Sequence, residues 1–164
     1  MKRYCDMKRM TRGNNFMTLD TIKTPYDQDF MLWLTETVQH LKSGNFDQID
    51  LENLIEEVEA LSRQEKRELK NRLTTLFEHI LKLQYVSLPE CYRGWEITIA
   101  RTQNDLKDIL EDSPSLKNYL EEICEQCYQR ALKNVVLEYP SNFPHDFPFS
   151  TNPDVLLTHQ FWQK

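Results

Sequence analysis

The longest stretch with a regular hydrophobic pattern lies between residues 50 and 86 and contains neither glycine nor proline. Its apolar side chains recur every three or four residues, at Leu51, Leu54, Ile55, Val58, Leu61, Leu69, Leu73, Leu76, Phe77, Ile80 and Leu83. At about 100° per residue these positions form one stripe along a helix. Asp50 precedes the stripe, and we expect its carboxylate to cap the first turn. The pattern therefore predicts one long central helix, or two collinear helices with a kink near Ser62.

Three other stretches have the same helical spacing and predict helices over residues 27–43, 95–111 and 114–137. Gly44 is expected to end the first of these helices, and residues 87–94 (SLPECYRG) are expected to form a turn. Ser113 is the expected N-cap of the last helix, with Pro114 at its first position. Phe46 and Ile49 are expected to anchor their loop on the core. Because these helices must cover the central stripe, the sequence predicts an all-α fold, a helical bundle built on one long or kinked central helix.

The end of the chain alternates prolines with aromatic residues. The prolines are Pro140, Pro144, Pro148 and Pro153, and the aromatics are Tyr139, Phe143, Phe147 and Phe149. So many prolines exclude a long helix, and so many aromatics are not typical of a free linker. We therefore expect an extended tail over the bundle. A short helix from about residue 153 to residue 159 should follow, with Phe161 and Trp162 docking the end.

Charge separates the N-terminus from the rest of the chain. Residues 1–24 hold six basic and two acidic residues, a local charge of +4, so the other 140 residues carry −10 of the total of −6. These first residues have no helical period, which predicts a disordered leader over 1–24 and a single helical domain over 25–164. Met17 is an alternative start. An acidic body repels phosphates, which argues against nucleic-acid binding. The chain has neither an apolar run of the ~18–20 residues that cross a bilayer nor a signal peptide, so we predict a soluble, cytoplasmic protein.

The four cysteines are Cys5, Cys91, Cys124 and Cys127. The last two form a C-x-x-C pair one turn apart in a predicted helix, whereas a structural zinc needs about four converging ligands. We therefore interpret both as small core residues. The E-x-x-H pairs of di-metal bundles, the glycine-rich phosphate loops and the hydrolase motifs are all absent. The sequence thus predicts no metal and no cofactor, and whether the protein is an enzyme stays open.

Polar residues along one edge of the central stripe are the candidates for chemistry. Glu65, Arg72 and His79 follow at intervals of seven residues, and Glu57 flanks the same edge. One interpretation is a line of ion pairs that fixes the helix register. The other is a small-ligand site between the first helix and the central helix, because desolvation at a core boundary shifts the pKa values of such groups. The residues of that site would be Trp33, Glu57, His79 and Lys82.

Several segments are similar to those of a known family. The runs YDQDFMLWL, DLENLIEEVEAL, HILKLQY, SPSL and NPDVLLTHQFW, between about Tyr26 and Trp162, resemble domain-of-unknown-function family 29. Its members are small proteins found largely in cyanobacteria and some proteobacteria. The resemblance implies an all-helical fold and a bacterial cytoplasm, but no catalytic residue, because the family has no established activity. Leu83 stands where members present an aromatic after H-x-L-K, which argues against an aromatic at that position being part of a site.

Two classes of function remain. The first is a small cytosolic helical protein that acts through protein–protein contacts, with a protein partner or as a homodimer. Its support is the absence of catalytic motifs and an aromatic tail suited to covering a groove. The second is an enzyme or small-ligand binder that uses the pocket described above. A nucleic-acid role would be confined to the basic leader, and no membrane contact is expected.

Overall fold

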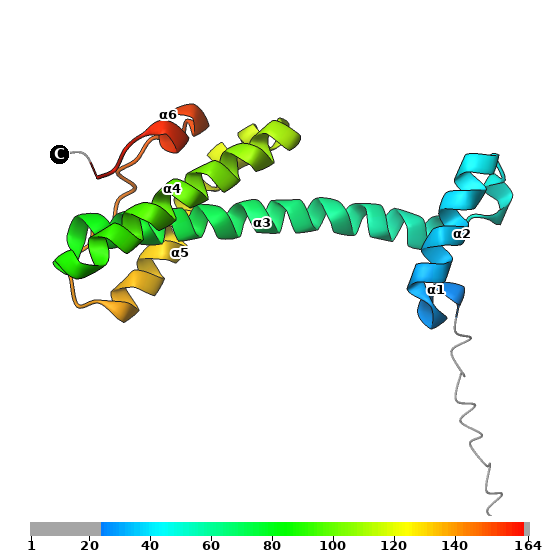
Figure 1. Ribbon diagram of the computed structural model, residues 1–164, viewed down its shortest axis with the longest axis horizontal. Helices are drawn as coiled ribbons and strands as arrows, with labels where there is room; N and C mark the ends of the chain where they lie inside the picture. Colours follow the sequence, from blue (N-terminus) through cyan, green and yellow to red (C-terminus); the bar gives the residue numbers. More distant parts are fainter. Residues whose placement is uncertain (1–23, 163–164) are drawn as a thin grey trace, which may run out of the picture. The chain divides into compact units, whose positions relative to one another are not determined.

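The structure, a computed structural model, describes residues 24–162. Every regular element in this range is helical (Figure 1): α1 (Pro25–Gln28), α2 (Phe30–Ser43), the 3-10 helix η1 (Phe46–Gln48), α3 (Leu51–Tyr85), α4 (Pro89–Asp112), α5 (Leu116–Glu138) and α6 (Pro153–Thr158). The predicted all-α fold is confirmed. The chain divides into two units, residues 1–54 and 55–164, each described by itself below. The predicted leader, apart from residue 24, lies outside the described residues, and the single domain stays a prediction.

In the first unit, the helix predicted over residues 27–43 is split at Asp29. The backbone of Asp29 is extended, with a φ of −150°, so this residue ends α1. Its carboxylate then accepts a hydrogen bond of 2.9 Å from the backbone N–H of Leu32, which caps α2. Gly44 ends α2 in the left-handed region, with a φ of 73°, where glycine has no steric penalty. The predicted stop is confirmed.

The loop that follows α2 differs from the prediction at one residue. Phe46 begins the 3-10 helix η1 and is 66% exposed, so the prediction that it anchors the loop on the core is wrong. The physical reason is local: the short turn of η1 leaves the Phe46 side chain on the surface. Ile49, the other predicted anchor, is half-buried.

The central helix is continuous. α3 runs for 35 residues and is not interrupted at Ser62, so the prediction of one long helix is the correct alternative. Asp50 caps it as predicted, because its carboxylate accepts a hydrogen bond of 3.3 Å from the backbone N–H of Asn53. No helix in residues 24–162 is long and apolar enough to cross a membrane. The longest of them, α3, carries charged residues along its whole length.

The turn predicted over residues 87–94 is wrong, because α4 begins at Pro89. A proline in the first turn costs nothing, since the N–H that it lacks has no partner there in any helix. Gly94 lies inside α4, and its intrinsic cost of about 1 kcal/mol is outweighed by burial of neighbours such as Trp95, which is 8% exposed.

The predicted start of the next helix is also wrong. Ser113 ends α4 by donating its backbone N–H to the carbonyl of Ile109, whereas α5 begins only at Leu116. The local signal was ambiguous, because a serine before a proline suits the end of one helix as well as the start of another.

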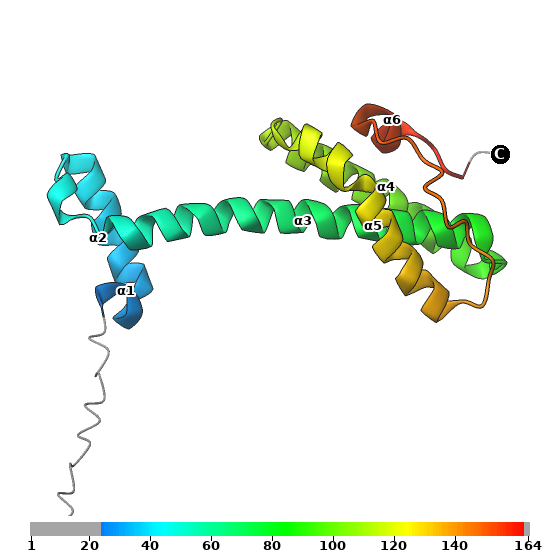
Figure 2. The same cartoon turned by 180° about the vertical axis from the view of Figure 1, so that it is seen from behind.

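The core of the second unit lies between the C-terminal half of α3 and the two helices that follow it. Figure 1 and Figure 2 show that α4 and α5 lie against this half of α3. Five apolar residues of the stripe are fully buried there: Leu69, Leu73, Leu76, Phe77 and Ile80. Ile99 and Leu106 from α4, and Leu120 and Val135 from α5, are also fully buried in this core.

The tail packs on this core as predicted. Residues 139–152 contain no helix, and Phe143 is only 5% exposed. The Phe147 ring centroid lies 5.6 Å from that of Phe77 and 5.4 Å from that of Tyr128. The Tyr128 hydroxyl donates a hydrogen bond of 2.5 Å to the carbonyl of Pro144. These three contacts tie the tail to α3 and α5.

The short terminal helix α6 is held by polar contacts at both ends. The side chain of Asn152 accepts a hydrogen bond of 3.2 Å from the backbone N–H of Val155 and so caps its start. Gln103, buried on α4, donates to the carbonyls of Leu156 and His159 at 3.1 Å and 3.0 Å. Half-buried Phe161 and Trp162 pack against the core after α6, as predicted.

Candidate functional site

Trp33, the first predicted site residue, is a core residue of the first unit. It lies on α2 and is 4% exposed. Its ring centroid is 4.9 Å from that of Tyr26 and 5.7 Å from that of Phe30. Within residues 24–162, its indole N–H has no hydrogen-bond partner.

Glu57, His79 and Lys82 all lie on α3 in the second unit. His79 and Lys82 are within one helical turn of each other. Glu57 precedes His79 by 22 residues, which is about 33 Å along a continuous helix. A small ligand can therefore contact Glu57 or the His79–Lys82 end of the helix, and not both. That Trp33 joins either of them stays a prediction.

The surroundings of His79 support a structural role. The ring is half-buried, and its Nδ1 lies 2.9 Å from the backbone carbonyl of Thr75. Because a carbonyl only accepts, Nδ1 must be the protonated nitrogen in this hydrogen bond. The two residues are one helical turn apart, so this hydrogen bond fixes the ring against its own helix.

The other charges of the predicted edge are paired with α4 and the turn after it. Arg72 forms ion pairs with Asp105 on α4 and, at 3.4 Å, with Glu68 on its own helix. The Glu65 carboxylate accepts a hydrogen bond of 3.1 Å from the hydroxyl of Ser113. These contacts support the interpretation of the edge as a line of polar pairs that fixes the helix register.

Lys82 carries its charge into the interior. Its side chain is 11% exposed, and its Nζ lies 2.5 Å from a carboxylate oxygen of Glu138, the last residue of α5. The same Nζ lies 5.7 Å from the ring centroid of Tyr139. A buried ammonium group needs such a partner, because removing it from water is otherwise costly. Glu138 is the counter-ion that meets the charge of Lys82.

Cys124 and Cys127 are both fully buried on α5, which confirms their interpretation as core residues. Burial raises the pKa of the Cys124 thiol to about 12, with a smaller contribution from Cys127. Burial also raises the pKa of Cys127. Thiols of this kind do not act as nucleophiles near neutral pH. In the part of the chain that the structure describes, no three His, Cys, Asp or Glu residues are grouped to hold a metal ion.

The N-terminal half of α3 presents a surface that the hydrophobic pattern did not distinguish from the core. Ile55, Val58 and Leu61 are 51%, 58% and 63% exposed, although they belong to the stripe that is fully buried from Leu69 to Ile80. On a helical projection Glu57 lies beside one edge of these three residues and Glu59 beside the other. We call these five residues, Ile55, Glu57, Val58, Glu59 and Leu61, the acidic apolar face.

The core helices do not reach this face because they end near Glu65. The turn between α4 and α5 meets α3 there, through the hydrogen bond from Ser113 to Glu65. Ser62, about one turn before Glu65, still lines a surface pocket with residues of α5, and the acidic apolar face precedes it on α3. A possible signal in the sequence was the charge pattern, since residues 50–62 contain five acidic and no basic residues.

Together these features define an all-helical protein whose core is assembled on half of one long helix. Residues 25–162 match the family model described as Domain of unknown function DUF29, and the chain belongs to that family. The resemblance seen in the sequence is confirmed. No curated protein and no solved structure matches the chain. Since the function of the family is unknown, the candidate sites rest on the geometry of the chain itself.

Proposed function

We propose that the protein acts through protein–protein contacts made by the acidic apolar face, and that its partner presents a basic amphipathic helix. The observation that carries the proposal is the exposure of Ile55, Val58 and Leu61, on a stripe that is fully buried from Leu69 to Ile80. The proposal takes the protein to act in a bacterial, in particular cyanobacterial, cytoplasm.

The spacing of the exposed residues supports a helical partner. Single apolar residues on a surface are common, but Ile55, Val58 and Leu61 follow at intervals of three and form one continuous strip. A partner helix with apolar residues at the same spacing would cover this strip, as in helix-in-groove recognition. Burial of its apolar area would then stabilise the complex.

The charges beside the strip indicate a basic partner. Glu57 and Glu59 flank it on its two edges, and Glu59 pairs with Arg63 at 3.3 Å. Both members of that pair are more than half exposed, so it contributes little, and Glu59 can exchange Arg63 for a partner cation. A second copy would bring like charges together, because residues 50–62 have five acidic and no basic residues.

The test measures binding of a fluorescein-labelled helical peptide made of leucines at a/d spacing with lysines elsewhere. We expect the Val58→Gln/Leu61→Gln double variant to weaken this binding about tenfold, because two apolar contacts are lost. The matched control is Val136→Gln/Leu137→Gln, which changes the same residue types at 51% and 87% exposed positions on α5. Its affinity should equal that of the parent protein.

Three results would overturn the proposal. The first is equal binding of the peptide by the two double variants. The second is binding of a peptide with glutamates in place of the lysines as tightly as the basic one. The third is a dimer of the parent protein in sedimentation equilibrium that Val58→Gln/Leu61→Gln dissociates, which would assign the face to a second copy.

A further inference from the structure

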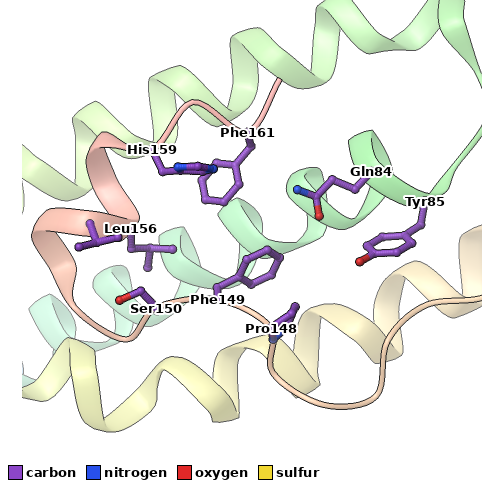
Figure 3. Close-up of a pocket in the computed structure, with 9 residues that line it drawn as sticks. Gln84, Tyr85, Pro148, Phe149, Ser150, Leu156, His159 and Phe161 are labelled. Carbon is purple, nitrogen blue, oxygen red and sulfur yellow. The ribbon is translucent and has the colours of Figure 1, made fainter. Parts of the chain in front are cut away.

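A cavity of about 360 Å³ opens within the second unit, between the end of α3, the tail and the segment that follows α6. Figure 3 shows where its walls come from. Gln84 and Tyr85 belong to the last turn of α3, Phe149 to the tail, and His159 and Phe161 to the segment after α6.

The lining of this cavity is uncharged and rich in rings. None of the residues that line it is Lys, Arg, Asp or Glu. The ring centroid of Phe161 lies 5.7 Å from that of Phe149, with the two planes at 89°, and 4.7 Å from that of His159. Such walls favour a flat aromatic ligand, which can meet one ring face to face and another at its edge.

Polar groups with free hydrogen-bonding capacity complete the lining. No hydrogen-bond partner within residues 24–162 is found for the amide of Gln84 or the hydroxyl of Tyr85. The Ser150 hydroxyl accepts a hydrogen bond of 3.1 Å from the backbone N–H of Asn152, and its own proton remains available. A primary amide offers a donor and an acceptor side by side, so Gln84 suits a ligand with the complementary pair on one edge.

The walls are held in place by the core. Phe149 stacks on fully buried Phe77, with a centroid distance of 5.7 Å and an angle of 11° between the planes. On the opposite side, the buried Gln103 side chain holds the carbonyls of Leu156 and His159. A site formed before the ligand arrives costs little ordering on binding.

We propose that this cavity binds a small uncharged nitrogen heteroaromatic ring that carries a hydrogen-bond donor and an acceptor on one edge. The ring packs against Phe149 and Phe161, and the edge pairs with the amide of Gln84. A volume of about 360 Å³ is at the small end of ligand pockets and suits one or two fused rings. Phosphorylated or carboxylated ligands are disfavoured, because neither lysine nor arginine lines the cavity. The site shares no residue with the acidic apolar face, so the two proposals are tested independently.

The test uses isothermal titration calorimetry of the full chain with three probes, adenine, hypoxanthine and 2-aminopyridine. We expect saturable one-site binding of at least one probe, and about tenfold weaker binding to Gln84→Leu, which keeps the size of the side chain and removes its amide. The matched control is Gln64→Leu, the same change at an exposed position elsewhere on α3, which should bind like the parent protein. Phe161→Leu should also weaken binding, because it removes one aromatic wall.

The proposal would be overturned if none of the three probes bound saturably up to its solubility limit. It would also be overturned if Gln84→Leu and Gln64→Leu bound the probes equally. Tighter binding of adenosine monophosphate than of adenine would contradict the assignment to an uncharged ligand. Because Gln84 is exposed, its substitution should leave the thermal melt unchanged, which separates lost binding from lost folding.

Discussion

Lys82 and Glu138 illustrate at the residue scale how burial makes a polar contact matter. The Lys82 side chain is 11% exposed, whereas that of Glu138 is 50% exposed. Removing the carboxylate would leave a buried ammonium group without its counter-ion, whereas removing the ammonium group would leave a carboxylate that water can still reach. Loss of the Glu138 carboxylate should therefore lower the free energy of unfolding more than loss of the Lys82 ammonium group.

We predict that Glu138→Gln lowers the free energy of unfolding by about 1–3 kcal/mol, less than for a fully buried pair, because Glu138 is half exposed. Lys82→Met replaces the cation by an apolar side chain of similar length, and should cost about 1 kcal/mol or less. Urea denaturation of both variants provides the measurement. A larger loss for Lys82→Met than for Glu138→Gln would contradict this account of the pair.

The buried thiols lead to a second prediction at the residue scale. In a Cys5→Ser/Cys91→Ser variant, Cys124 and Cys127 should react with a disulfide reagent at pH 8 only after denaturation, because burial raises the pKa of both thiols. Rapid reaction of two thiols in the native protein would contradict their burial.

The same pKa shift predicts how stability depends on pH. The pKa of Cys124 is about 12 in the folded chain and near 9 when unfolded. The unfolded state therefore loses its proton first, so the contribution of this thiol to stability is complete below pH 9 and declines as the pH rises toward 12. Urea denaturation midpoints should fall over this range, and less so in Cys124→Ala.

At the scale of elements, α3 is one helix with two different environments. Its stripe is continuous in sequence, yet Leu76 is fully buried and Leu61 is 63% exposed. The covering helices α4 and α5 account for the difference, since the turn that connects them meets α3 near Glu65, after Leu61 in the chain.

We predict that Leu76→Ala lowers the free energy of unfolding by about 2–5 kcal/mol, because the truncation leaves a cavity in the core. Leu61→Ala makes the same chemical change on the same helix and should cost less than about 0.5 kcal/mol. Both values come from urea denaturation. Equal losses for the two variants would mean that the N-terminal half of the stripe is covered as well.

At the scale of the whole molecule, the tail is part of the core of the second unit rather than a covering that can be removed. It brings Phe143, Phe147 and Phe149 onto α3 and α5, where Phe77 and Tyr128 are fully buried. Prolines keep this segment from forming a helix, and the aromatic side chains provide the apolar area that orders it.

We predict that Phe147→Ala destabilises the protein by about 2–4 kcal/mol, because its ring contacts both Phe77 and Tyr128. His145→Ala, at an exposed position two residues earlier, is the control and should change stability by less than about 0.5 kcal/mol. Thermal melts and binding of a hydrophobic dye provide the measurements. A melt of Phe147→Ala equal to that of the control would mean that the tail is not anchored in solution.

The features that were predicted correctly from the sequence depend on neighbouring residues. Gly44 ends a helix because its own backbone adopts a positive φ, and Asp50 caps the next one through an amide three residues away. The absence of glycine and proline from residues 51–85 predicted helix throughout, with a kink near Ser62 left open until the structure showed one continuous helix. The prolines and aromatics after residue 138 were enough for an ordered, non-helical tail.

The sequence by itself thus determined the fold class, the extent of the central helical segment and the nature of the tail, because helical period, caps and prolines act over a few residues. Only the tertiary structure decided which half of the stripe is buried, and that Glu138 meets the charge of Lys82. It alone also brought Gln84 beside Phe149 and Phe161. The physical reason is that burial and cavities depend on which distant segments meet, and a helical stripe has the same pattern whether or not another helix covers it.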